Sequence, residues 1–230
     1  MIDKTPTSAG YQWIVCVKLL ILFVLLTTYL TAQAGCDDAQ IERANLQSPS
    51  QSTLEAIACS TSETTGNVAI TFSVKGNRMA VVHTTYESNA YVPSLDTNIR
   101  FGKNNEQGFG VSTGKGRDGS GMHYWKIADN STQLIDLGET PALTRDRHSK
   151  ETYSGLVTSS GEHQSVRYVY EIRNNTLVAV KAVGFSTPNP NYFTITIMRF
   201  GKDGRVIVEG KRNLSLARGI SCMKGNTKCW

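Results

Sequence analysis

The chain has 230 residues, a formal net charge of +5 and 40% hydrophobic residues. The excess of positive charge is small and contains no block of like charges. This argues against nucleic acid as the partner, because phosphate binding usually requires a clustered basic face with aromatic platforms.

The first segment in chain order is predicted to be an export signal. The apolar run over residues 19–30 follows Lys4 and Lys18 and precedes small residues, which is the layout of a secretory signal peptide. The run is too short for a membrane-spanning helix, which needs roughly 20 apolar residues. Cleavage after Ala34 makes residues 1–34 the signal peptide and leaves 230 − 34 = 196 residues, enough for one domain with a sizeable core. We therefore expect a periplasmic or secreted protein.

A second type of processing stays open at residues 31–38, TAQAGCDD. Ala34 and Gly35 before Cys36 fit a lipoprotein signal, but Gln33 replaces the leucine-type residue expected three positions before the cysteine. Lipidation of Cys36 would anchor the chain to a membrane and leave an odd number of cysteines. The ordinary cleavage is favoured because it keeps all the cysteines available for pairing.

The four cysteines after the leader are Cys36, Cys59, Cys222 and Cys229. An even number in an oxidising compartment predicts two disulfides. The local pairs Cys36 with Cys59 and Cys222 with Cys229 are favoured, while the two other connectivities stay open. Either of those would join the ends of the domain and stabilise it more, since longer closed loops lose more unfolded-state entropy.

Residues 35–62 are predicted to form an N-terminal arm with a short helix. Ser52-Thr-Leu-Glu55 fits a capping box, in which the serine and glutamate side chains satisfy two backbone amides at a helix start. A short apolar turn follows over residues 54–58. Beyond this arm the hydrophobic period changes from helical to twofold.

Residues 63–230 are predicted to be a single antiparallel β domain. Three hairpins are expected, because pairs of β-rich runs flank turn residues that accept a left-handed backbone. The turns are Lys75-Gly-Asn77, Asn174-Asn175 and Lys202-Asp-Gly204, and further strands are expected at residues 122–127, 133–137 and 153–158. Roughly nine short strands with almost no helical periodicity predict an all-β antiparallel fold, sandwich-like or like a small propeller.

The segment from Asn104 to Gly121 is unusual because it holds six glycines together with Lys115, Arg117 and Asp118. Glycine at this density weakens a regular strand, so part of the segment is expected to be a loop. Loops on rigid β scaffolds commonly carry binding residues. A partner-binding loop and a bare surface loop fit the pattern equally.

The sequence contains no zinc or redox motif, because His-Glu-x-x-His and Cys-x-x-Cys do not occur. Gly110-Val-Ser-Thr-Gly114 has the spacing of Gly-x-Ser-x-Gly, but it lies in a β-rich segment without the following helix that a nucleophile elbow requires. His83 and His123 lie in predicted strands, where structural roles are commoner than catalytic ones, and His148 and His163 lie in charged turns. A hydrolase is therefore a minority hypothesis, which a cleft with two acids, or a histidine beside an acid, would support.

An ordered set of residue types resembles that of exported bacterial β-domains, among them I-type lysozyme inhibitors and the periplasmic immunity lipoproteins that protect cells from lysozyme-like effectors. The set comprises Met122-His-Tyr-Trp-Lys-Ile127, Leu134-Ile-Asp-Leu137, Leu143 with Asp146, Tyr153-Ser-Gly155, Tyr168-Val-Tyr170 and Asn175-Thr-Leu-Val178. The resemblance covers residues 91 to 183.

The resemblance implies inhibition by occlusion, in which loops of a rigid β scaffold enter the substrate groove of a cell-wall hydrolase. A lysozyme cleft holds two catalytic carboxyl groups, with which basic or hydroxyl donors can pair. The residues expected to bind such a protein partner are Lys115, Arg117, Asp118, Tyr153 and Ser154, and Asp118 has the alternative role of stabilising its loop. Membrane contact is expected only if Cys36 is lipidated.

Domains of this kind often carry a calcium-type Asp-x-Asn-x-Asp-Gly loop before the aromatic strand. The matching segment here keeps Asp96 and Asn98 but places Arg100 where the third ligand would stand. Because a cation at that place would repel calcium, the sequence predicts no metal, and no cofactor is implied.

The main alternative function is a carbohydrate or surface-recognition module. Exposed aromatic side chains such as Tyr91, Trp125 and Tyr192 would then form a flat platform. A coplanar cluster of these rings at the surface would distinguish this function from inhibition.

Overall fold

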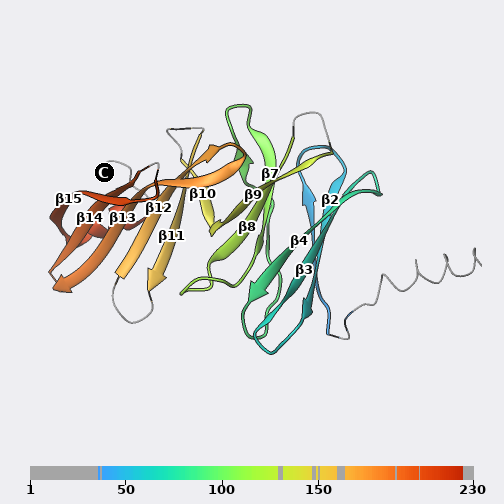
Figure 1. The fold of residues 1–230 in the computed structure, drawn as a ribbon, viewed down its shortest axis with the longest axis horizontal. Helices are drawn as coiled ribbons and strands as arrows, with labels where there is room; N and C mark the ends of the chain where they lie inside the picture. Colours follow the sequence, from blue (N-terminus) through green and yellow to red (C-terminus); the bar gives the residue numbers. More distant parts are fainter. Residues whose placement is uncertain are drawn as a thin grey trace, which may run out of the picture. The chain divides into compact units, whose positions relative to one another are not determined.

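A computed structural model describes residues 36, 38–128, 132–146, 149, 151–159, 164–189, 191–201 and 203–224. The chain divides into two units, Met1–Asp37 and Asp38–Trp230, and every described strand belongs to the second. The predicted signal peptide, residues 1–34, lies outside the described residues. The second unit is an all-β, antiparallel fold of three sheets followed by one short helix, which confirms the predicted sandwich-like class (Figure 1).

The first sheet consists of four strands that pair in chain order. They are β1 (Gln40–Leu46), β2 (Ser52–Ser60), β3 (Thr65–Val74) and β4 (Asn77–Glu87). Alternate side chains of β2 and β3 are buried, which is the twofold period of strands that face a core on one side. The predicted hairpin between β3 and β4 is confirmed, and Lys75 and Gly76 at its turn have positive φ values of 52° and 79°.

The helix predicted near Ser52 is wrong, because this segment forms strand β2. Leu54, Ala56 and Ala58 face the core at every second position and are at most 2% exposed. Strand β2 pairs with β1 on one side and with β3 on the other. A capping box is a local preference, whereas two ladders of hydrogen bonds and three buried side chains stabilise the strand. The segment is therefore part of the first sheet, and the described helix lies near the C-terminus instead.

The second sheet contains the first half of the glycine-rich segment as a strand. Its strands are β5 (Leu95–Asp96), β7 (Glu106–Ser112), β8 (Gly121–Ile127) and β9 (Leu134–Pro141), and β6 (Arg100–Phe101) pairs with β7. Glycine in β7 makes room for aromatic rings: a Cβ on Gly108 would lie 2.3 Å from the ring of Phe101. Residues 113–120 form a loop, as expected for part of this segment.

The third sheet has six strands that also pair in chain order. They are β10 (Leu143–Arg145), β11 (Thr152–Ser159), β12 (Gln164–Arg173), β13 (Thr176–Asn189), β14 (Tyr192–Phe200) and β15 (Val206–Ser215), and helix α2 (Leu216–Met223) follows. The two other predicted hairpins are confirmed here. Positive φ values occur at Asn174 and Asn175 in the β12–β13 turn and at Gly204 between β14 and β15.

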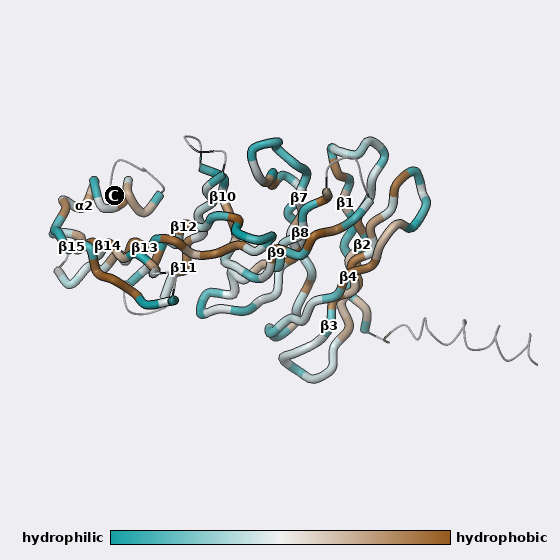
Figure 2. Tube along the Cα trace, turned by 45° about the horizontal axis from the view of Figure 1, so that its top comes forward, coloured by the Kyte–Doolittle hydropathy of each residue, from teal (hydrophilic) through white to brown (hydrophobic). Residues whose placement is uncertain are grey.

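The buried apolar side chains form three clusters, of which two join neighbouring sheets. Phe109 and Trp125 of the second sheet pack with the first sheet, whereas Tyr124 packs with Tyr153 of the third. A third cluster lies between strands β13 to β15 and helix α2. Figure 2 shows hydrophobic stretches within the strands and hydrophilic residues gathered at many of the turns. The second sheet therefore packs against a neighbouring sheet on each of its two faces.

Candidate functional site

The glycine-rich loop, residues 113–120, connects β7 to β8 and is closed by its own backbone. Thr113 N–H donates to the Gly121 carbonyl over 2.8 Å, and Gly121 N–H donates to the Lys115 carbonyl over 2.9 Å. Gly114, Gly116 and Gly119 have positive φ, a conformation that side chains other than glycine rarely adopt. The glycines and these hydrogen bonds thus give the loop a defined backbone conformation.

Asp118 ties this loop to the third sheet. Its Oδ2 accepts a hydrogen bond of 2.7 Å from the Thr158 amide of β11, and its Oδ1 accepts one of 3.1 Å from the Ser120 amide. Partial burial opposes ionisation, but these hydrogen bonds outweigh it and hold the pKa of Asp118 below its ordinary value. The contacts of Asp118 are those of a residue that stabilises its loop.

Lys115 ties the loop to the first sheet and to β9. Its Nζ donates to Glu139 Oε1 over 2.8 Å and to Thr85 Oγ1 over 3.0 Å. The side chain of Lys115 is 25% exposed and that of Glu139 is 39% exposed, so the pair is partly shielded from solvent. Lys115 is consequently engaged inside the domain, and its charge is largely matched by Glu139.

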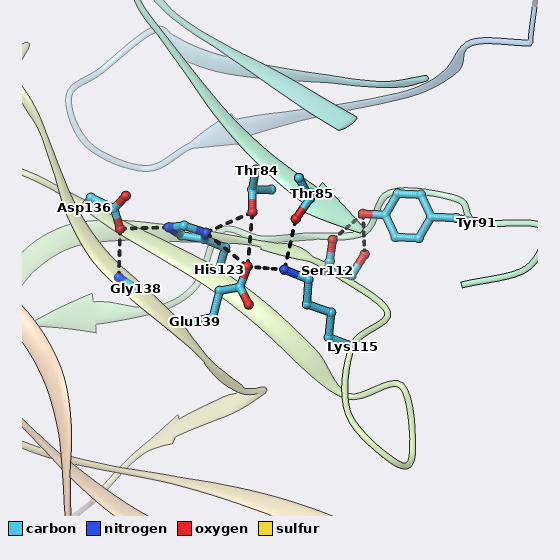
Figure 3. A network of polar contacts seen from close by, with 9 residues as sticks. All are labelled: Thr84, Thr85, Tyr91, Ser112, Lys115, His123, Asp136, Gly138 and Glu139. Carbon is cyan, nitrogen blue, oxygen red and sulfur yellow. Dashed lines mark hydrogen bonds and ion pairs between the residues drawn. The ribbon is translucent and has the colours of Figure 1, made fainter. Parts of the chain in front are cut away.

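His123 lies at the centre of a polar network that continues from Glu139 (Figure 3). Its Nε2 lies 2.7 Å from Asp136 Oδ1, and its Nδ1 lies 2.9 Å from Thr84 Oγ1 and 3.7 Å from Glu139 Oε1. The imidazole also stacks on Trp125, with 4.1 Å between ring centroids. Both ring nitrogens thus have partners, and the network joins β4 of the first sheet to β8 and β9 of the second.

A hydroxyl, an imidazole and a carboxylate in series are also the residue types of a hydrolytic triad. Here the geometry opposes that role. Thr84 is only 8% exposed, which leaves its hydroxyl out of reach of a substrate carbonyl. The His123 side chain is 13% exposed and is held against Trp125. The series is therefore suited to joining two sheets, as expected for a structural histidine, rather than to nucleophilic attack.

A pocket of about 190 Å³ lies at the base of the glycine-rich loop. It is lined by Thr113, Lys115, Gly116, Ser120, Gly121, Glu139, Thr140, Pro141 and Val157. Typical small-molecule sites enclose about 300–1,000 Å³, so this pocket suits a single side chain of a partner better than a complete small ligand.

Arg117 is at the exposed part of the same loop, between Gly116 and Asp118. Its Nη1 lies 3.4 Å from Ser159 Oγ, at the long limit of a hydrogen bond. In contrast to Lys115, it has no carboxylate partner among the ion pairs of the described residues. Arg117 therefore presents a positive charge that no described carboxylate matches, on a loop that is anchored to all three sheets.

Two residues predicted to bind a partner lie away from this loop surface. The prediction for Tyr153 is wrong, because its side chain is fully buried, its ring packs 5.1 Å from that of Phe101, and its hydroxyl accepts from the Gly102 amide over 2.7 Å. Burial also raises the pKa of the Tyr153 hydroxyl. Ser154 is half-buried, and its Oγ accepts a hydrogen bond of 3.0 Å from Arg167.

The aromatic platform of the carbohydrate-binding alternative is not formed. Trp125 is 1% exposed in the core between the first and second sheets, and Tyr91 is 9% exposed and stacks on Tyr86 with 4.0 Å between centroids. Both rings pack inside the domain and are not available at its surface. A flat surface of Tyr91, Trp125 and Tyr192 is therefore excluded.

Two side chains of the segment matched to a calcium loop have hydrogen-bond partners within the protein. Asp96 Oδ1 accepts from the Asn98 amide over 3.0 Å, and Arg100 donates to Gln47 Oε1 over 2.8 Å. In the part of the chain that the structure describes, no group of three or more His, Cys, Asp or Glu side chains could hold a metal ion. His148 and His163 lie outside that part.

The predicted disulfide between Cys36 and Cys59 is present. Cys222 is also disulfide-bonded, while Cys229 lies outside the described residues. Disulfides fit a chain that matures in an oxidising compartment, as expected for an exported protein. None of the described helices is long and apolar enough to cross a membrane.

The network residues Thr84, Asp136 and Glu139 were not predicted from the sequence. They lie on two strands separated by about fifty residues of chain, so no local spacing connects them with His123. The sequence gives only a weak signal for this network, namely the two carboxylates of strand β9, Asp136 and Glu139. Such a pattern indicates a polar contact without identifying its partners.

No family model matches the chain, and no curated protein matches it. Among solved structures, the chain is similar to one described as "Structure of a Xanthomonas Type IV Secretion System related protein". The two share 11% sequence identity and a TM-score of 0.47, over 75% of this chain and 99% of that chain. Similarity at this level assigns neither a family nor a function.

Proposed function

We propose that this protein is an exported binding protein that inhibits a lysozyme-like peptidoglycan hydrolase, with the glycine-rich loop entering the enzyme's cleft. Such an inhibitor could act as an immunity protein, which protects a cell from the hydrolase that it binds. The proposal joins the sequence resemblance to one structural observation. Arg117 stands unmatched by any described carboxylate on a loop whose two neighbouring charges, Lys115 and Asp118, are already used to hold it.

The physical basis is preorganisation. A loop that is fixed before binding loses little conformational freedom when it enters a cleft, so more of the contact energy is available as affinity. The hydrogen bonds of Asp118 to β11 and of Lys115 to Glu139 provide this fixation. A guanidinium donates in a planar fork that matches a carboxylate, and a glycosidase cleft supplies two carboxyl groups.

The roles of the remaining predicted residues follow from their contacts. Lys115 and Asp118 position the loop, and Arg117 makes the contact with the partner. Ser154, half-buried on β11, is left outside the proposed contact surface. The pocket beside Lys115 would then take one side chain from the rim of the hydrolase cleft.

The proposed location is the periplasm or the cell exterior, with a soluble mature chain. A sulfur atom in a disulfide cannot also carry the thioether of a lipid anchor, so the Cys36–Cys59 disulfide favours the soluble form.

The test is a cell-wall lysis assay. Mature protein is added to a panel of lysozyme-type hydrolases, and the rate of clearing of a peptidoglycan suspension is followed together with binding by calorimetry. We expect one class of hydrolase to be inhibited, with Arg117→Glu weakening inhibition at least tenfold and Arg117→Ala less. Arg173→Glu is the matched control, because Arg173 is an exposed arginine on β12 that pairs with Glu171. Absence of inhibition across the panel, or equal loss in both variants, contradicts the proposal.

A further inference from the structure

Strand β15 is an edge of the third sheet with an unusual apolar surface. In the described residues it pairs with β14 alone. Val206, Ile207 and Val208 are consecutive and are 55%, 46% and 62% exposed. Exposed apolar edges are normally interrupted by lysine, proline or a bulge, since they offer unpaired backbone groups to another strand. Val206–Val208 contains no lysine or proline, and the register shift against β14 comes only after Val208, so the outer edge of these three residues can accept another strand.

The charges that flank the apolar residues are arranged antisymmetrically. The sequence Arg205-Val-Ile-Val-Glu209 has a positive charge before the apolar triplet and a negative charge after it. When two copies of this stretch run antiparallel about Ile207, each Arg205 stands opposite a Glu209 and each Val206 stands opposite a Val208. If the two strands are shifted by two positions, Arg205 no longer stands opposite Glu209, or Val206 no longer stands opposite Val208, or both pairs are lost. The stretch is therefore complementary to itself in one register.

The side chains needed for this pairing lie on consistent faces of the sheet. Val206 and Val208 stand opposite Phe200 and Met198 of β14, and Ile207 stands opposite Arg199. Arg199 also forms an ion pair of 3.0 Å with Glu209, which places Glu209 on the side of Ile207. A register shift follows Val208, so Glu209 lies at the irregularity, one residue beyond the regularly paired triplet.

The existing partners of the two charges do not prevent the pairing. Arg205 contacts Asp203 at 2.9 Å, but their side chains are 85% and 56% exposed. Glu209 and Arg199 are 37% and 62% exposed. Exposed ion pairs of this kind contribute little to stability, so a second oppositely charged neighbour adds to them without a large loss.

We propose that two copies of this chain associate through β15, antiparallel about a twofold axis at Ile207, so that their third sheets join into one continuous sheet. The four valines of the pair then lie together on the face that already carries Met198 and Phe200. Backbone hydrogen bonds between the two edges supply affinity, and the two Arg205–Glu209 pairs fix the register. This association is independent of the hydrolase proposal, since residues 205–209 are distinct from the glycine-rich loop.

The experiment is sedimentation velocity of the mature chain over a wide concentration range, using charge reversals at the two ends of the stretch. Arg205→Glu places Glu opposite Glu209, and Glu209→Arg places Arg opposite Arg205, so each variant alone should dissociate at least tenfold more readily. An equimolar mixture of the two variants restores both opposite-charge pairs. We expect the mixture to form a heterodimer as stable as the wild-type dimer. Arg173→Glu is the control that should leave association unchanged.

Several outcomes would overturn the proposal. A wild-type chain that stays monomeric at all concentrations excludes the second copy as the occupant of this edge. Dimers that persist in both single variants place the interface elsewhere. Failure of the mixture to recover association excludes the register about Ile207. Circular dichroism and thermal melting of each variant establish that the fold is retained, which separates loss of association from loss of structure.

Discussion

Gly110 of β7 lies beneath the ring of Tyr124 on the neighbouring strand β8, so close that a Cβ on Gly110 would stand 2.5 Å from Cε1 of the tyrosine. The ring is fully buried and its hydroxyl accepts a hydrogen bond of 2.8 Å from the Leu143 amide. Tyr124 is therefore fixed at both ends and cannot move away. The small size of Gly110 is what allows the second and third sheets to pack together here.

Gly110→Ala is expected to destabilise the fold by about 1–3 kcal/mol, the usual cost of overpacking a core. Urea denaturation followed by circular dichroism measures it. Gly210→Ala is the matched control, because a Cβ at Gly210 would meet nothing within 4 Å. Equal midpoints for the two variants would show that the tyrosine ring can shift.

Arg167 should be essential for holding helix α2 against the third sheet. Its side chain is buried, with Nη1 donating to Ser154 Oγ over 3.0 Å and Nη2 donating to the Met223 carbonyl at the helix end. Burial lowers the pKa of Arg167, yet a guanidinium titrates so far above neutrality that it stays charged. Arg167→Met keeps the apolar stem but leaves the partly buried Met223 carbonyl without this donor.

We expect this substitution to cost about 1–3 kcal/mol of unfolding free energy and to increase amide exchange in residues 216–223 first. Arg173→Met, at an exposed site on the same strand, should change neither quantity. If Arg167→Met were as stable as the wild type, the helix would be held by its apolar contacts alone.

The attachment of the glycine-rich loop to β11 should depend on pH. The pKa of Asp118 is lower in the folded state, so the folded chain favours the ionised carboxylate more than the unfolded chain does. The resulting stabilisation is fully present above the ordinary aspartate pKa of about 4 and is lost as the pH falls through the lower folded value. The loop should therefore stay anchored at neutral and mildly acidic pH and loosen only in stronger acid.

The Thr158 amide resonance in nuclear magnetic resonance spectra reports on this hydrogen bond directly. We expect it to shift with a midpoint below pH 4 in the wild type, and to be insensitive to pH over that range in Asp118→Asn. A wild-type midpoint at or above the ordinary aspartate value would mean that the hydrogen bonds to Asp118 do not favour its charged form.

Cys36 should carry no lipid. Its sulfur is bonded to Cys59, and a thioether would require that sulfur to be free. Digestion without reduction, followed by mass spectrometry, should give a linked peptide that contains both cysteines. A diacylglyceryl adduct on the N-terminal peptide, with Cys59 as a free thiol, would be the contrary result.

Much of the fold could be predicted because its turns carry local signals. Lys75-Gly76 and Asn174-Asn175 accept positive φ, and they mark hairpins wherever two β-rich runs flank them. The helix that was wrongly predicted near Ser52 also rested on a local signal. A capping box is read from four neighbouring residues, whereas the strand that forms there depends on β3 and on a core completed by Trp125 far along the chain.

The candidate site was only partly predictable. The glycine-rich loop could be located, and Lys115 and Asp118 do form its principal contacts. Their partners Glu139 and Thr158 come from other strands. The sequence could therefore not show that Lys115 and Asp118 have partners inside the domain, or that no described carboxylate pairs with Arg117. Tyr153 was misplaced because a strand of alternating residues does not reveal which of its faces is covered by another sheet.

The chain-order pairing of the strands bears on how the polypeptide reaches its native state. In the first and third sheets each strand bonds to its immediate neighbour in sequence, and β7, β8 and β9 do the same. Pairing between neighbours in sequence closes shorter loops than pairing between distant strands, and closing a short loop costs less chain entropy. Successive hairpins can therefore form one after another as the polypeptide emerges from a translocation channel, without waiting for the C-terminal half. A chain organised in this way is suited to acquiring its structure vectorially, after crossing a membrane unfolded.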